Sequence, residues 1–262
     1  MATEIFDQHT KARGSSGSAP FVRQVLIQTQ FELLLTLRRG ENILITLFVP
    51  VLLLIFFASL NIVPAVNGHA VNFLLPGILA LAVMAAGMVN LGIATAYERY
   101  YGVLKRLGGS PLPRSGLITA KVASVLVLEV IQVILLVGVA MVLYGWQPAG
   151  SPLLALLAMA LGTVTFAAIG LAMAGALRAE ITLAGANALF LLFVLLGGGI
   201  LPLSHLPAPL AAIAQFLPAA ALTQALQATM SNNATFPGFA FLVLTVWAVV
   251  VLLVAIRTFQ WE

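Results

Sequence analysis

The residue best placed to do chemistry at membrane depth is Glu129, which lies in the middle of a long apolar run. A carboxylate there is costly if it faces lipid, so it must face other helices, a partner helix or water. Gln132 follows three residues later and shares its side of a helix. Two interpretations stay open: the pair contributes polar contacts to a substrate or proton path, or a protonated Glu129 makes a hydrogen bond between helices. Asn90 and Asn187 are weaker candidates for the same path, since such amides often join neighbouring helices.

Groups for other kinds of catalysis are sparse. The chain has no cysteine, which excludes disulfides, thiolate metal sites and cysteine nucleophiles. His9, His69 and His205 are scattered, so the sequence shows no cluster with metal-ligand spacing. The phosphate-binding pattern Gly-x-x-x-x-Gly-Lys-Ser/Thr is absent from the sequence. The sequence therefore predicts a protein that is not itself an enzyme and holds no cofactor.

The composition indicates an integral membrane protein. Of the 262 residues, 61% are hydrophobic and 8% are charged, and the mean hydropathy is +1.10, whereas soluble domains have about 25% charged residues. Lysine and arginine fall before the first apolar run and after every second one. Because cytoplasmic loops retain these residues, the alternation predicts six crossings with both termini in the cytoplasm. The same bias explains the net charge of +4 and argues against nucleic-acid binding.

Six apolar runs are long enough to cross a bilayer core, which takes about 20 helical residues. The predicted fold is therefore all-α: a polytopic membrane protein with six transmembrane helices in one bundle. The predicted spans cover residues 43–60, 73–96, 117–144, 153–176, 183–201 and 236–256.

The N-terminal part of the chain divides into a polar tail and an amphipathic segment. Residues 1–20 predict a flexible cytoplasmic tail, and residues 21–262 a single transmembrane domain. Residues 21–39 predict an interfacial helix, the alternative being a cytoplasmic extension of the first span. Its apolar stripe comprises Phe21, Val22, Val25, Leu26, Leu33 and Leu37, with Arg23, Gln24 and Gln28 away from the stripe.

Residues 202–230 are apolar but broken by prolines, and they follow three consecutive glycines. Pro202, Pro207, Pro209 and Pro218 interrupt the segment, which contains no charged residue. Because proline breaks a helix interior, this stretch cannot be one spanning helix. It predicts a re-entrant helical hairpin that enters the outer leaflet and returns before the last span, shielded by protein.

The inner segment 97–116 mixes aromatic, charged and turn-forming residues. Within it, residues 98–107 predict a short amphipathic helix that ends at two glycines and a proline. A plain solvated loop does not explain the aromatic side chains, the leading acid and the sharp C-terminal stop.

In this segment the sequence resembles the membrane subunits of ABC transporters of the type-2 exporter class. The family typically has an acid and arginine, a glycine and leucine, basic residues, a Ser/Thr-Pro turn and a basic residue entering span three. The matching residues are Glu98, Arg99, Gly102, Leu104, Lys105, Arg106, Leu107, Ser110, Pro111 and Lys121. Residues 201–207 and the Leu217-Pro218 pair are similar to the family's outer re-entrant hairpin, so the resemblance covers the chain beyond its tail.

The resemblance implies a permease subunit without ATPase activity of its own. Two copies of a separate ATPase subunit would bind ATP and Mg²⁺, and a second permease, identical or paralogous, would complete the pump in a bacterial plasma membrane. The family exports drugs, lipids, glycolipids and other amphiphiles, and such efflux can confer antibiotic resistance. The apolar spans favour a hydrophobic or amphiphilic cargo.

In such a pump the inner segment is predicted to couple the permease to its ATPase, because it is the only inner loop long enough to fold as a helix. Its aromatic and aliphatic side chains would fill a groove of the partner, while its charges set the register. The predicted coupling residues are Tyr97, Glu98, Arg99, Tyr100, Tyr101, Gly102, Leu104, Lys105, Arg106 and Leu107.

The main rival interpretation is a proton-coupled secondary transporter that uses Glu129. Such a protein is expected to have inverted repeats and several charges within its spans, and the sequence has neither. A second rival interpretation is a membrane protein with a structural or assembly role only, but this role does not explain the aromatic and acidic composition of the inner segment.

Overall fold

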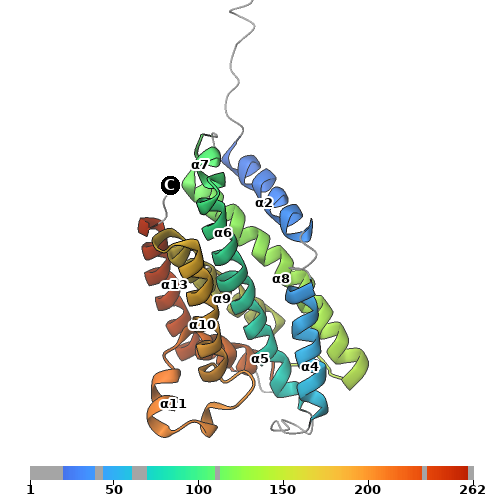
Figure 1. The fold of residues 1–262 in the computed structure, drawn as a ribbon. Helices are drawn as coiled ribbons and strands as arrows, with labels where there is room; N and C mark the ends of the chain where they lie inside the picture. The colour runs from blue at the N-terminus through green and yellow to red at the C-terminus, as the bar shows by residue number, and fades with distance from the viewer. Residues whose placement is uncertain (1–19, 39–43, 61–69, 110–112, 232–234, 259–262) are drawn as a thin grey trace, which may run out of the picture.

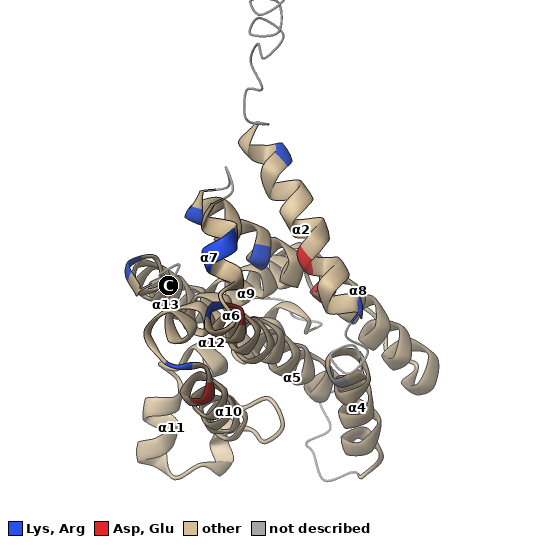
Figure 2. Ribbon diagram, turned by 45° about the horizontal axis from the view of Figure 1, so that its top comes forward, with Lys and Arg blue, Asp and Glu red and all other residues tan. Residues whose placement is uncertain are grey.

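The fold is an all-α bundle, as predicted. The computed structural model describes residues 20–38, 44–60, 70–109, 113–231 and 235–258. These residues form helices and their connections, with no strand among them. Helix α7 (Val103–Gly108) and the end of α13 (Gly238–Thr258) lie at one end of the bundle, and α11 (Ala208–Ala214) lies at the opposite end (Figure 1). Lysine and arginine residues gather towards the end that carries α7 (Figure 2), so we call it the charged end.

Within the described part of the chain, five helices are long and apolar enough to cross a membrane. They correspond to the last five predicted spans and confirm a polytopic membrane protein. The five are Val71–Tyr100, Arg114–Tyr144 (α8), Pro152–Ala176 (α9), Ala179–Leu196 (α10) and α13.

The first predicted span, 43–60, forms a shorter helix than the other five. A π-helical segment, η1 (Leu44–Phe48), leads into α4 (Val49–Ser59). The apolar helix Thr46–Ser59 is below the length that crosses a bilayer core without help from its flanks. Residues 39–43 lie outside the described part of the chain.

The second span is the centre of the bundle, since 83% of its most apolar window is buried, against 22% for α10. It consists of α5 (Val71–Met84), a π-helical segment η2 (Ala85–Asn90) and α6 (Leu91–Tyr100). Glycines bring it against α9: a Cβ added at Gly92 would lie 2.9 Å from the Cα of Gly170. Small residues allow such close backbone contact between helices in lipid.

The proline-broken segment 202–230 folds into short helices at the end of the bundle opposite α7 (Figure 1). After a 3₁₀ turn at Leu203–His205, α11 and α12 (Pro218–Thr229) meet at an angle of 81°. Helix α12 is largely buried against α5, α9 and α13, so protein rather than lipid surrounds it. This geometry suits a bent span as well as a re-entrant hairpin, and the hairpin stays a prediction.

The N-terminal helix α2 (Phe21–Arg38) forms as predicted and lies along α8 (Figure 1). Its orientation, however, is the reverse of that of an ordinary surface helix. Glu32 is its buried residue, and Gln28 is half-buried, whereas Leu26 and Phe31 are exposed. The polar side turns inward because Glu32 has a charged partner there, and the apolar side is left to face outward.

The predicted helix 98–107 is wrong as a single element. The second span continues to Tyr100, and a turn at Tyr101 and Gly102 separates it from α7. Gly102 has φ of 71°, a left-handed conformation that glycine adopts without penalty and that ends the first helix. The segment is therefore the end of a span followed by a short separate helix.

Candidate functional site

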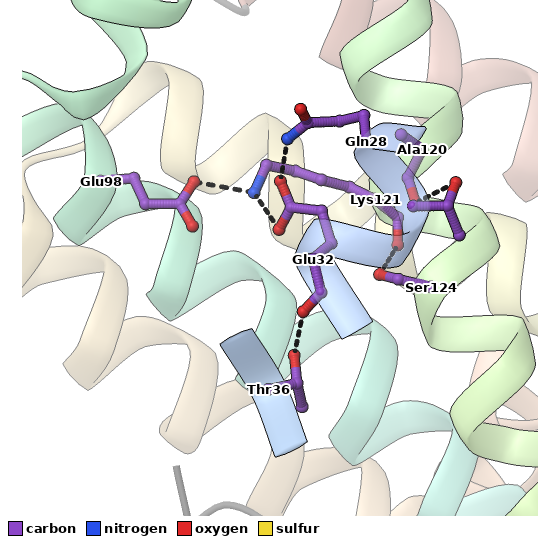
Figure 3. A network of polar contacts seen from close by, with 8 residues as sticks. Gln28, Glu32, Thr36, Glu98, Ala120, Lys121 and Ser124 are labelled. Atoms are coloured by element: carbon purple, nitrogen blue, oxygen red, sulfur yellow. Dashed lines mark hydrogen bonds and ion pairs between the residues drawn. The ribbon is translucent and has the colours of Figure 1, made fainter. Parts of the chain in front are cut away.

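A buried ionic junction joins three helices at the charged end. The Nζ of Lys121, on α8, lies 2.7 Å from Glu98 Oε2 on α6 and 3.0 Å from Glu32 Oε2 on α2 (Figure 3). Lys121 is only 1% exposed. Glu32 is held in place by Gln28, whose Nε2 donates to Glu32 Oε1 at 2.9 Å.

The junction stabilises the packing of α2 only while all its charges are present. Removing one partner of a buried ion pair leaves an uncompensated charge and typically costs about 3–5 kcal/mol. Beside the junction lies a cavity of about 60 Å³, lined by Glu32, Glu98, Asn90, Thr36 and Ser124 among others. Its polar walls and size suit one or two ordered water molecules.

Arg99, the next residue after Glu98, holds the other side of α6. Its guanidinium donates to the carbonyl oxygens of Gly175 and Leu177, at the end of α9 and the turn into α10. The last carbonyls of a helix lack backbone donors, and a basic side chain supplies them. Two consecutive residues therefore tie the end of α6 to α8, and through Lys121 to α2, on one side, and to the end of α9 and the turn before α10 on the other.

Three of the predicted coupling residues make contacts within their own chain. Glu98 is paired with Lys121, Arg99 donates to backbone carbonyls, and Leu104 is 1% exposed and packs in the core. Glu98 and Arg99 are half-buried, and their direct contact with an ATPase stays a prediction. Tyr97 and Leu107 are half-buried.

The outward-facing remainder of the segment is aromatic and basic. Tyr100 and Tyr101 are 63% and 68% exposed, and their ring centroids lie 5.1 Å apart. Tyr97 stacks on Tyr101 with centroids 6.1 Å apart. Lys105 and Arg106 are exposed on α7, where Figure 2 shows basic residues at the end of the bundle.

Glu129 makes a contact between two spans. It is 3% exposed, and its Oε2 is hydrogen-bonded to the hydroxyl of Thr163 on α9. The Thr163 hydroxyl also lies 2.8 Å from the carbonyl oxygen of Met159. A hydroxyl has one hydrogen, so both contacts are satisfied at once when a protonated Glu129 donates to Thr163 and Thr163 donates to Met159.

The other predicted path residues meet at a membrane-level pocket of about 360 Å³. Its walls come from η1, α4, α5, η2, α8 and α10, and its lining is mostly apolar. Asn90, Gln132 and Asn187 all lie in this lining, whereas Glu129 does not. The structure thus brings together three of the four predicted residues and separates the fourth.

Two π-helical segments build the polar wall of this pocket. Asn90, in η2, donates to the Thr46 hydroxyl in η1 at 3.0 Å. Gln132 donates to the backbone carbonyl of Thr46. Where a π-helix passes into an α-helix, the backbone hydrogen bonds change their spacing, and some carbonyl oxygens are left for side chains to bind. This explains why the carbonyl oxygen of Thr46 accepts a hydrogen bond from Gln132.

The sequence analysis missed Thr46, Thr163, Glu32 and the role of Lys121. Two signals were present: Lys121 is a charge beyond the first turn of a long apolar helix, and Glu32 is an acid in an otherwise apolar stretch. Charges in such places need a partner. Thr46 and Thr163 carry no such signal, because threonines are common in membrane helices.

Residues 23–231 match the family described as ABC-2 type transporter. The chain belongs to the ABC-2 type transporter family. The match runs from α2 through α12 and so includes the junction, the pocket and the segment around α7. No curated protein matches the chain significantly.

Membership of the ABC-2 type transporter family defines the general role of the chain. It is the membrane component of an ABC transporter, a multi-pass permease. A component of this kind is not itself an enzyme, and the family implies an ABC ATPase as its partner.

Proposed function

We propose that this permease exports a hydrophobic or amphiphilic substrate, such as a drug, lipid or glycolipid, from the cytoplasm or inner leaflet. In this proposal the charged end faces the cytoplasm of a bacterium, as the bias of lysine and arginine favours. Two permeases, identical or paralogous, pair with two ATPase subunits, which bind the ATP and Mg²⁺.

The observation that carries the proposal is the apolar pocket between α4, α5 and α10. Its volume of about 360 Å³ is within the range that holds a small organic ligand. Aliphatic and aromatic side chains such as Phe57, Ile78 and Phe190 would hold an apolar body. Asn90, Gln132 and Asn187 would orient a polar group of the substrate. Ligand pockets are typically built in this way, with mostly apolar walls and a few polar side chains.

Coupling to the ATPase would use the exposed part of the inner segment and the contacts behind it. Tyr100, Tyr101 and the basic residues of α7 offer aromatic anchors and charge to a partner. A displacement of α6 would then pass through Glu98 to α2 and α8, and through Arg99 to α9 and α10. Span two also lines the pocket, so the same displacement would reach the substrate.

The proton-coupled alternative has no specific support. Glu129 contacts Thr163 and does not line the pocket, and family membership points to ATP as the energy source.

Two tryptophan substitutions at neighbouring positions of α10 test the proposal. Val194 lines the pocket, whereas Leu195 is the next residue, is 66% exposed and is not in the lining. In proteoliposomes with the cognate ATPase, Val194→Trp should abolish stimulation of ATP hydrolysis by amphiphilic drugs and lipids, and Leu195→Trp should retain it. Equal stimulation in both variants would place the substrate elsewhere.

A further inference from the structure

A second, larger concavity lies at the charged end, apart from the junction and the pocket. It has a volume of about 680 Å³ and lies between the end of α6, the turn from α9 to α10 and the end of α13. Its polar and aromatic lining residues are Arg99, Tyr100, Arg178, Glu180, Arg257 and Thr258. We call it the basic cleft.

The described lining residues of the basic cleft carry an excess of positive charge. Three guanidinium groups and one carboxylate line it, which gives a balance of +2. Arg99 is occupied by the carbonyls of Gly175 and Leu177. The side chains of Arg178 and Arg257 have neither a hydrogen bond nor an ion pair with any other described residue.

The helices next to these two arginines also present apolar side chains to the outside. Ile181, in the first turn of α10 and three residues after Arg178, is 53% exposed, and Ile256, directly before Arg257 on α13, is 58% exposed. Both helices are long enough to cross the membrane, so such side chains are expected to meet lipid. The cleft therefore combines two guanidinium groups that have no partner among the described residues with adjoining apolar side chains.

We propose that the basic cleft binds the headgroup of an anionic phospholipid. Arg178 and Arg257 hold the phosphate, because guanidinium pairs well with phosphate oxygens. The hydroxyl of Tyr100 and the carboxylate of Glu180 line the cleft and would meet a headgroup alcohol, and the Thr258 hydroxyl, which donates to the carbonyl oxygen of Val254, can still accept. The acyl chains run along the apolar sides of α10 and α13. Basic pockets between transmembrane helices are known binding sites for anionic headgroups.

An acidic segment of the ATPase is the other possible occupant of a basic cleft. The lipid is favoured because Ile181, three residues after Arg178, and Ile256, directly before Arg257, are exposed and apolar. Binding of a protein segment alone would not explain why exposed apolar side chains lie beside the arginines. The inference depends on membrane insertion and on the cleft, and not on the proposed cargo or direction of transport.

The test measures lipid binding to the purified full-length chain in detergent by native mass spectrometry. The probes are dioleoylphosphatidylglycerol and dioleoylphosphatidylcholine, with inorganic phosphate as a competitor. The variants are Arg178→Gln, Arg257→Gln and the two combined. The matched control is Arg23→Gln with Arg38→Gln, two exposed arginines on α2.

Each cleft substitution should weaken phosphatidylglycerol binding about fivefold, and the pair roughly 30-fold, since a basic residue near a headgroup contributes on the order of 1 kcal/mol. Phosphatidylcholine binding and the control variant should change little, and unchanged melting temperatures show that the variants fold.

Three results would overturn the proposal. One is equal affinity of the unaltered chain for the two lipids. Another is displacement of phosphatidylglycerol by an equal concentration of inorganic phosphate, which would make the site one for free phosphate. The third is a double variant that keeps its lipid affinity but no longer captures the ATPase, which would make the cleft a protein-docking surface.

Discussion

Lys121 is the residue on which the packing of α2 depends most. Lys121→Met would leave Glu32 and Glu98 as two uncompensated carboxylates in a largely buried site, a loss of about 3–5 kcal/mol. The melting temperature of the purified chain in detergent should fall clearly. Neutralising the whole junction, with Glu32→Gln and Glu98→Gln added, should recover much of the loss, because no buried charge then remains. The control is Arg38→Met, a change at an exposed position. If Lys121→Met melts at as high a temperature as this control, the junction does not stabilise the chain.

Glu129 is expected to act as a hydrogen-bonding group between spans and not as a charge. Glu129→Gln keeps a donor for the Thr163 hydroxyl and should preserve both the melting temperature and the pH profile of transport. Glu129→Leu removes the contact and should destabilise the chain by about 1–3 kcal/mol. Thermal unfolding and a transport assay at several pH values distinguish the two variants. Loss of transport in a stable Glu129→Gln protein would instead assign the carboxylate to the path.

At this scale the sequence indicates which residues need partners but does not identify the partners. The position of Glu129 in an apolar run predicts that it is buried, which the structure confirms. Its partner Thr163 lies 34 residues away, and Lys121 is 89 residues from Glu32. Such pairings depend on which helices are neighbours, and no local pattern specifies that.

The break between α6 and α7 is the element-scale feature most open to test. Gly102→Ala meets no atom within 4 Å, so its only penalty is the φ of 71°, about 1–2 kcal/mol. The strain should favour a helix that continues past Tyr100 and should redirect α7. We expect normal insertion but a lower ratio of transport to ATP hydrolysis in the assembled pump.

Gly138→Ala is the matched control for this prediction. It too adds a methyl group to open space, but it lies within the helix α8 and has no positive φ. Alanine is preferred to glycine there, so the control should be slightly stabilised. If the two variants have the same coupling ratio, the break does not transmit force.

The helices themselves were largely predictable, whereas their irregularities were not. Long apolar runs predicted six spans, and five of them form helices long and apolar enough to cross a membrane, because membrane helices must be long and apolar. The π-helical segments η1 and η2 have no sequence signal of their own. The orientation of α2 could not be predicted, because an apolar stripe shows that a helix has two sides, but not whether water or lipid lies outside it.

For the whole molecule, the proposed orientation predicts which side of the membrane each end of the bundle faces. The chain has no cysteine, so single cysteines report their own positions. Ser204→Cys and Ser231→Cys, which flank α11 and α12, should both react with an impermeant maleimide from outside intact cells. Lys105→Cys, on α7, should react only after permeabilisation. Reaction of Ser204→Cys and Ser231→Cys from opposite sides would make α11 and α12 a bent span.

The overall architecture follows from composition and charge, but the assembly of the site does not. Alternating basic loops predicted an even number of crossings, and hydrophobic runs predicted their places in the chain. The pocket arises because residues of six elements, η1, α4, α5, η2, α8 and α10, converge on one volume. That convergence depends on which helices are neighbours in three dimensions, which no local sequence pattern specifies.

The inward polar side of α2 also constrains how the protein is made. Synthesis runs from the N-terminus, so Glu32 leaves the ribosome 89 residues before Lys121. A lone carboxylate cannot leave water cheaply, so nascent α2 has to wait at the aqueous surface until span three has been inserted. Only then can the junction close and the apolar side of α2 turn towards lipid. Closure of the junction therefore has to follow insertion of the helix that carries Lys121, and a chain in which it does not close leaves α2 undocked.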